Sequence, residues 1–126
     1  MMKALLLIAH GSRRRASNDE IERLAERLRR KAGDRFHCVR HAFLELAEPS
    51  IADGIQQCID AGADEVYALP YFLAEGNHVA KDIPAEISRK QKERPAVKIH
   101  LCGYLGQADE PVADLLLQIA EKQING

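Results

Sequence analysis

The chain alternates strand-like apolar runs with amphipathic stretches four times, and this alternation restricts the fold more than any other feature. Residues 3–9, 35–43, 66–71 and 97–102 form short apolar or strand-like runs, of a length typical of strands and too short for core helices. Each run is followed by a stretch that repeats apolar residues at helical spacing. The pattern predicts a parallel sheet with helices on both faces, joined by right-handed crossovers.

Four helices are predicted, at about 17–33, 49–62, 79–93 and from 109 onward. The first begins with the capping box Ser17-Asn18-Asp19-Glu20, the second has a proline in its first turn, and glycines end both. The last helix carries apolar side chains that we expect to face the core. These are Val112, Leu115, Leu116 and Ile119.

The expected fold is a single three-layer αβα lobe, a single domain spanning residues 1–126, with a four-stranded parallel sheet. We expect the strand order 2-1-3-4, because the second crossover of such folds commonly passes to the other side of the first strand. The topological switch then lies between the first and third strands. Ligands bind at such a switch, outside the carboxyl ends of the strands.

Composition excludes several function classes. The chain has 126 residues, 46% of them hydrophobic, and a net charge of -1, which gives no general reason to expect nucleic acid or a membrane as a partner. The first apolar run leads directly into His10 and three arginines, so it is interpreted as a strand rather than a signal peptide. Three widely spaced cysteines without a C-x-x-C pair suggest reduced thiols and a cytoplasmic protein.

Two histidines beside glycine follow the first and third predicted strands. His10 stands in Ala9-His10-Gly11-Ser12-Arg13, and His78 ends Pro70-Tyr71-Phe72-Leu73-Ala74-Glu75-Gly76-Asn77-His78. At a switch point the two imidazoles would share one crevice, an arrangement that suits a first-row divalent metal. The alternative is that each histidine only closes a turn, and that Ser12 and Arg13 cap and solvate the first helix.

Two carboxylates also lie near this expected crevice. Glu45 and Glu48 follow the second strand, either as acids at a helix N-terminus or as groups that move protons or deliver the metal. Asp82 is interpreted as a helix-start acid rather than a ligand. His37 and His41 would share a face of the second strand, which makes them a weaker candidate pair for a metal.

These motifs, over essentially the whole length, resemble the small CbiX-type sirohydrochlorin chelatases of the ATP-independent (class II) chelatase superfamily. The resemblance rests on Leu5-Leu6-Leu7-Ile8-Ala9-His10-Gly11-Ser12-Arg13, on Phe43-x-Glu45-x-x-Glu48-Pro49, on Leu105-Gly106, and above all on the segment 70–84. It implies insertion of a divalent metal into sirohydrochlorin, on the routes to cobalamin, sirohaem or coenzyme F430, by a lyase.

The resemblance also implies roles for particular residues. His10 and His78 match the metal-binding histidines of the family, and His10 also matches its proton acceptor. Glu48 matches a substrate-contacting position. The third strand's loop supplies the other expected substrate contacts: Leu73, Ala74, Glu75, Gly76, Asn77 and His78.

Cobalt is the expected metal on family frequency, with nickel and iron as alternatives. No cofactor beyond this metal is expected, and without a G-x-x-x-x-G-K-[ST] loop the reaction should not need ATP. One lobe can cover only one face of a flat tetrapyrrole, so a homodimer is expected. A metal carrier without catalysis remains an alternative. A histidine phosphatase is disfavoured, because Ala9 replaces the arginine expected before its histidine.

Overall fold

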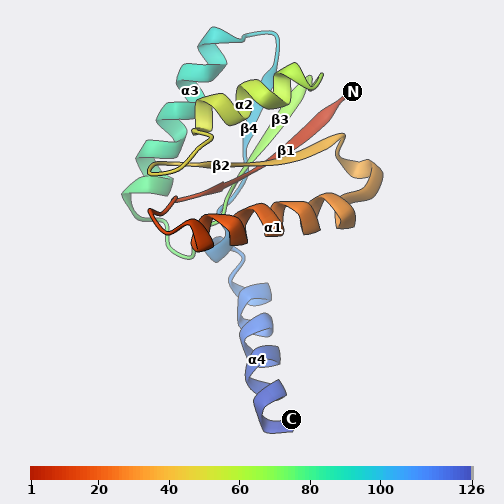
Figure 1. Cartoon of the computed structure of the whole chain (residues 1–126), viewed down its shortest axis with the longest axis vertical. Coiled ribbons are helices and arrows are strands. Elements are labelled where there is room, and N and C mark those ends of the chain that lie inside the picture. The colour runs from red at the N-terminus through yellow and green to blue at the C-terminus, as the bar shows by residue number, and fades with distance from the viewer. Residues whose placement is uncertain (126) are drawn as a thin grey trace.

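The computed structural model describes residues 1–125 and contains a four-stranded parallel sheet (Figure 1). Its strands are β1 (Lys3–Ala9), β2 (Cys38–Phe43), β3 (Glu65–Pro70) and β4 (Lys98–Leu101), in the spatial order β2-β1-β3-β4. The predicted fold class and strand order are confirmed. β1 pairs with both β2 and β3, so the topological switch lies at its carboxyl end.

Helices cover both faces of the sheet (Figure 1). Helix α1 (Arg15–Ala32) packs on β2 from one side, while α2 (Ile51–Asp60) and α3 (Ile83–Glu93) occupy the other. Three short turns complete the elements before the last helix, α4 (Asp109–Asn125). The turns are η1 (Gly33–Arg35), η2 (His78–Asp82) and η3 (Leu105–Gln107).

The start of α1 differs from the predicted capping box. The helix begins at Arg15, and Ser17 lies inside its first turn. Asn18 instead binds back to the preceding loop, since its side chain accepts from the Ser12 backbone N–H at 3.0 Å and donates to the Ser12 carbonyl at 2.8 Å. The polar side chains near the helix start therefore fasten the loop that follows His10, which the spacing rule for a cap did not anticipate.

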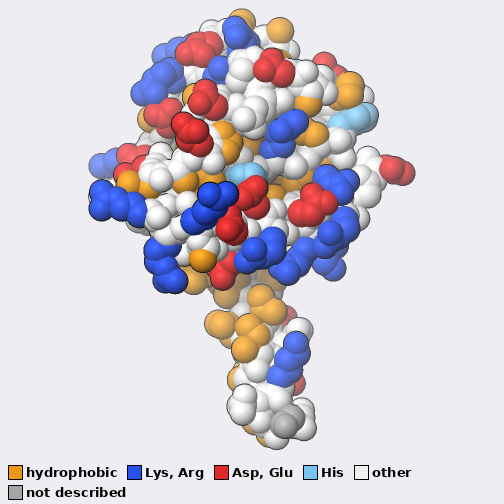
Figure 2. All heavy atoms as spheres, in the orientation of Figure 1, with side chains coloured by type: hydrophobic (Ala, Val, Ile, Leu, Met, Phe, Trp, Pro, Cys, Tyr) orange, Lys and Arg blue, Asp and Glu red, His pale blue; other side chains and the backbone are white. Residues whose placement is uncertain are grey.

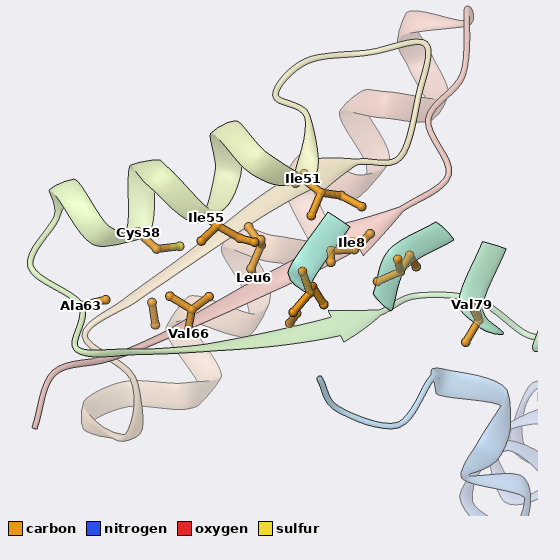
Figure 3. Close-up of a cluster of buried hydrophobic side chains, with 13 residues drawn as sticks. Leu6, Ile8, Ile51, Ile55, Cys58, Ala63, Val66 and Val79 are labelled. Atoms are coloured by element: carbon orange, nitrogen blue, oxygen red, sulfur yellow. The ribbon is translucent and has the colours of Figure 1, made fainter. Parts of the chain in front are cut away.

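The main core lies between the sheet and the pair α2 and α3. Alternate residues of β1 point into it, because successive side chains of a strand face opposite sides. Leu6 and Ile8 meet Ile51, Ile55 and Val66 there (Figure 3), all with 2% exposure or less. Gly54 brings α2 close to the sheet: a Cβ at this position would lie 2.8 Å from the Ala42 Cβ.

Helix α4 does not cover the core, so the prediction for its apolar residues is wrong. It projects away from the sheet (Figure 1), and Leu115, Leu116 and Ile119 are 54–61% exposed. The cause is local: Ala108 alone separates α4 from η3, and η3 directs the chain outward. Despite its apolar side chains, α4 does not qualify as a membrane span, and neither does any other helix within residues 1–125.

The close approach at Gly54 predicts a large effect of substitution. Gly54→Val should lower the free energy of unfolding by about 1–3 kcal/mol, because the added methyl groups must displace Ala42 and Leu6 in a packed core. Gln57→Val places the same side chain on the exposed side of α2 and should cost only a few tenths of a kcal/mol. Urea denaturation measures both. Equal effects would contradict the packing argument.

Candidate metal centre

Three potential metal ligands meet at the carboxyl end of the sheet, each from a different strand connection. His10 is the first residue after β1, Glu45 follows β2, and His78 opens the turn η2 beyond β3. Because the strands are parallel neighbours in the order β2-β1-β3, their carboxyl ends lie side by side. The structure thus brings together the two histidines that the sequence analysis singled out, and adds Glu45 from its secondary candidates.

The ligand atoms of His10, Glu45 and His78 all lie within 4.8 Å of one another. Nε2 of His10 is 2.6 Å from Oε2 of Glu45, and the two imidazole rings meet edge to face with their centroids 4.6 Å apart. Two imidazoles and one carboxylate form a donor set that suits first-row divalent metals. The three side chains are 41–52% exposed, so an ion can reach them from solvent.

Asp82 orients the imidazole of His78. The sequence analysis expected Asp82 to act only as an acid at the start of a helix. Oδ2 of Asp82 lies 2.8 Å from Nδ1 of His78, which comes one helical turn before Asp82 in η2. The Asp82 side chain makes no capping hydrogen bond to α3. A carboxylate can only accept a hydrogen bond, so the neutral imidazole carries its proton on Nδ1. Nε2 of His78 is then left with a free lone pair for a metal.

Gly11 allows Glu45 to approach His10. The Gly11 backbone has φ +96°, and a Cβ there would lie 1.8 Å from the Glu45 carbonyl oxygen. A side chain is therefore excluded by sterics as well as by backbone conformation. The Glu45 N–H donates to the His10 carbonyl at 3.0 Å, which holds the two loops together. The glycine next to the histidine thus has a direct structural purpose in the site.

A cavity of about 360 Å³ adjoins two of the three ligands, Glu45 and His78. Its walls come from the β2 loop, η2 and the start of α3, and consist of Leu44, Glu45, His78, Asp82, Ala85, Glu86 and Arg89. Arg89 is the one cation among these walls, and it pairs with Glu86 at 2.8 Å. The sequence offered no signal for Arg89, because its position beside His78 depends on how α3 packs. The Phe72 ring stands 6.4 Å from His10.

The loop from Leu73 to Asn77 is exposed and leads directly into His78. Its position fits the expected substrate contacts, which stay predictions. Ser12 accepts a hydrogen bond from the Arg14 N–H, and Arg13 is exposed beside the same loop. Both residues follow His10 closely in the chain. The hydrogen bond that Ser12 accepts gives its hydroxyl a structural role.

Glu48 does not join the three ligands. It lies at a separate depression of about 490 Å³ formed with α2, lined by Glu48, Pro49, Asp53, Gln56, Gln57 and Asp60. This is the larger of the two depressions, but its acidic wall is unsuited to an anionic ligand, so we place the chemistry at the smaller one. The substrate contact expected for Glu48 stays a prediction.

The remaining histidines and the cysteines lie outside the cluster. Burial lowers the pKa of His41, whose ring packs against Phe43 with centroids 5.5 Å apart. His100 stacks on Tyr67 and contacts Glu65 on β3. Cys38, Cys58 and Cys102 are all free thiols, as expected. None of these groups adds a ligand to the centre formed by His10, Glu45 and His78.

Comparison with known proteins supports the resemblance. A sirohydrochlorin cobaltochelatase of Methanococcus maripaludis is 42% identical over 83 residues, which are 66% of this chain and 56% of the relative. A chloroplastic sirohydrochlorin ferrochelatase of Arabidopsis thaliana is 34% identical over 95% of this chain and 50% of its own length. The chain therefore spans about half the length of these curated relatives.

A solved structure matches at full length. The cobalamin (vitamin B12) biosynthesis CbiX protein of Marinobacter aquaeolei VT8 superimposes with a TM-score of 0.79 and 28% identity, over 98% of this chain and 99% of that one. The family model described as CbiX matches residues 4–123, nearly the whole chain. The match of the family model to nearly the whole chain shows that the chain belongs to the CbiX family.

Proposed function

We propose that this protein inserts a divalent metal, cobalt in the first place, into sirohydrochlorin without using ATP. The observation that carries the proposal is the cluster of His10, Glu45 and His78, whose ligand atoms lie within 4.8 Å at the open end of the sheet. Two relatives named as sirohydrochlorin chelatases support the substrate. The absence of a phosphate-binding loop from the sequence supports independence from ATP.

The chemistry requires a metal to be held, stripped of water and exchanged for two pyrrole protons. His10, His78 and Glu45 would hold M²⁺ through imidazole nitrogens and a carboxylate oxygen, without the slow release expected of thiolates. As the metal moves to the four ring nitrogens, two pyrrole N–H protons leave. Once the metal has left the ligands, the freed imidazole nitrogen of His10 would accept one proton and the half-exposed Glu45 carboxylate the other, and both protons would pass on to solvent.

Sirohydrochlorin is flat and carries carboxylates. The carboxylates affect how the protein recognises the substrate, and the flat shape affects how many copies of the chain are needed to cover it. Arg89 in the cavity and Arg13 at the loop after β1 provide cations for the carboxylates. Glu48 and the loop 73–78 would complete the contacts. We also propose that residues 1–126 act as one lobe of a cytoplasmic homodimer, in which a second copy covers the other face of the ring.

The set of two imidazoles and one carboxylate does not select a single metal. Nitrogen and carboxylate donors bind iron, cobalt and nickel in a common order of affinity, so geometry alone favours none strongly. The Arabidopsis relative is named a ferrochelatase and the Methanococcus one a cobaltochelatase. Anaerobic reactions with each ion separately, at equal free concentrations, rank the three. A carrier without catalysis would bind the ions and leave the rate of metallation at that of the protein-free control.

Removal of either histidine should stop or severely slow metallation. His10→Ala should lower the rate of Co²⁺ insertion by at least about 100-fold, since it removes both a ligand and the proton acceptor. His78→Ala should reduce both cobalt affinity and rate. The anaerobic absorption spectrum of sirohydrochlorin measures the rate. His37→Ala, at an exposed histidine outside the cluster, is the matched control and should keep the wild-type rate.

An unchanged rate in His10→Ala would remove that residue from the mechanism. An equal loss in His37→Ala would instead mean that the variants act through general destabilisation. Circular dichroism on each variant separates the two explanations, because the side chains of His10 and His78 are 45% and 41% exposed and their loss should leave the helix signal intact.

Asp82→Asn tests the orientation of His78. The amide keeps the size of the side chain but loses the charge that holds the proton on Nδ1, so cobalt affinity should fall by roughly 10–100-fold. Isothermal titration with Co²⁺ alone measures this, independently of metallation. Asp82→Glu should recover part of the affinity. Glu22→Gln on α1 removes an exposed charge elsewhere and should leave the titration unchanged; the same loss there would point to net charge as the cause.

A further inference from the structure

Exposed apolar side chains of the lobe gather at the carboxyl end of the sheet. Charged side chains are spread over the surface of the lobe, and hydrophobic ones show between them only in small areas (Figure 2). Apart from Met1 and helix α4, every exposed large hydrophobic residue within residues 1–125 ends a strand or lies in the segment beyond it. These residues are Leu46 after β2, Tyr71 and Leu73 after β3, Leu101 at the end of β4, and Leu105 in η3. The lobe therefore offers apolar surface at the same end as the candidate metal centre.

Leu46 combines this exposure with a strained backbone. Its φ is +67°, in the left-handed region, where the Cβ approaches the following carbonyl oxygen and glycine is the usual residue. The other residues with positive φ within residues 1–125 are all glycines, namely Gly11, Gly33, Gly62 and Gly76. At Leu46 the described chain keeps a branched side chain in a conformation that disfavours it.

Hydrogen bonds on both sides hold the loop that contains Leu46. The Glu45 N–H donates to the His10 carbonyl at 3.0 Å, and the Phe43 N–H donates to the Pro49 carbonyl at 2.8 Å, which closes the loop. Leu46 lies within this closed loop, directly after the ligand Glu45. A strained residue persists where neighbouring contacts fix its conformation, and such residues gather at functional sites.

Packing in the core does not account for Leu46. Its side chain is 53% exposed, whereas Phe43, three residues earlier, is 2% exposed. A leucine that served only to fill the core would be buried. A loop that needed only this backbone conformation would be most stable with glycine. A ligand that covers the side chain when bound explains both the exposure and the strain.

The chemistry of metal insertion identifies this ligand as the face of the macrocycle. The four nitrogens of a tetrapyrrole lie in the ring plane, so an ion held by the protein must approach them from one face of the ring. Residues beside the metal ligands therefore meet that flat, apolar face, whereas the carboxylates extend from the ring edge.

Leu73 has the corresponding position after β3. It is 73% exposed and follows Phe72, whose ring stands 6.4 Å from His10. Because β1 lies between β2 and β3, the loops that carry Leu46 and Leu73 leave the sheet on either side of His10. Two exposed leucines therefore flank the ligand that follows the central strand.

We propose that Leu46, together with Leu73, binds the flat face of sirohydrochlorin and holds the ring over the metal ligands. The inference rests on the proposed function and adds a substrate-binding residue to it. Burial of the exposed part of the Leu46 side chain under the ring supplies affinity that does not depend on charge. A metal ligand and a ring contact then occupy consecutive residues, which brings the ring nitrogens close to the ion.

Shortening the side chain tests the contact. Leu46→Ala should raise the dissociation constant of metal-free sirohydrochlorin about fivefold, because the leucine no longer covers the ring. An anaerobic absorption titration without metal measures this. Leu46→Met keeps an apolar side chain of similar size and should bind nearly as tightly as the wild type. Leu28→Ala, at a half-buried leucine near the far end of α1 from the His10 loop, is the matched control and should leave the constant unchanged.

Salt distinguishes an apolar contact from a contact between charges. The ratio of the dissociation constants of Leu46→Ala and the wild type should be the same at low and high salt. The ratio for Arg89→Ala should shrink as salt rises, because dissolved ions screen the attraction between an exposed guanidinium and a carboxylate. Isothermal titration with Co²⁺ alone should give the same cobalt affinity for Leu46→Ala and the wild type, which separates ring binding from metal binding.

A glycine variant tests the argument from backbone strain. Leu46→Gly should have a higher midpoint of urea denaturation than Leu46→Ala, because glycine adopts a φ of +67° without a steric clash. In a helix or strand the order is the reverse. Leu46→Gly should nevertheless bind sirohydrochlorin as weakly as Leu46→Ala. If Leu46 had only a structural role, binding would follow stability.

The outcomes separate this inference from the proposed function. An unchanged dissociation constant in Leu46→Ala, a rise that disappears at high salt, or an equal rise in Leu28→Ala would each overturn the ring contact. A smaller mass of Leu46→Ala in light scattering would also overturn it, because Leu46 would then belong to a contact between copies. A wild type that binds sirohydrochlorin without inserting metal ends the proposed function and leaves the ring contact standing. A wild type that binds no sirohydrochlorin overturns both.

Discussion

The candidate site depends on the parallel pairing of β1 with two neighbours at once. Ile8 lies opposite Ala42 of β2 and Pro70 of β3, so the chain segments beyond all three strands begin at the same edge. His10, Glu45 and His78 come from these segments and could not meet if β1 were an edge strand. β1 is buried along all of its residues except Lys3, as expected of a central strand that is covered on both faces.

The geometry of the three ligands suits a metal ion that is bound for a time and then released to the substrate. The ligands are two imidazoles and a carboxylate, they are half exposed, and no thiol is among them. Each imidazole has a carboxylate partner, yet the two pairs differ. Glu45 faces Nε2 of His10 and is itself a potential ligand, whereas Asp82 binds Nδ1 of His78 and leaves the other nitrogen free. One pair is therefore suited to proton movement and the other to holding the ion.

The last helix begins close to the candidate metal centre. Turn η3, from which α4 departs, is bonded to Phe72, the residue whose ring stands near His10. This hydrogen bond fastens η3, and with it the start of α4, beside the candidate metal centre. Leu115, Leu116 and Ile119 of α4 are left exposed, because the helix projects from the lobe and does not pack on its own sheet.

The sequence by itself determined the local elements, the sheet order and the meeting of His10 with His78, because periodicity and crossover handedness act over short distances and leave few topologies. Asp82 could have been found from its i,i+4 spacing to His78. Only the tertiary structure decided that Arg89 enters the cavity, that Glu48 lies at another depression, and that α4 leaves the lobe. These depend on how rigid elements pack and on one hinge at Ala108. An amphipathic pattern predicts that one face of a helix packs against other apolar residues, but it does not identify those residues.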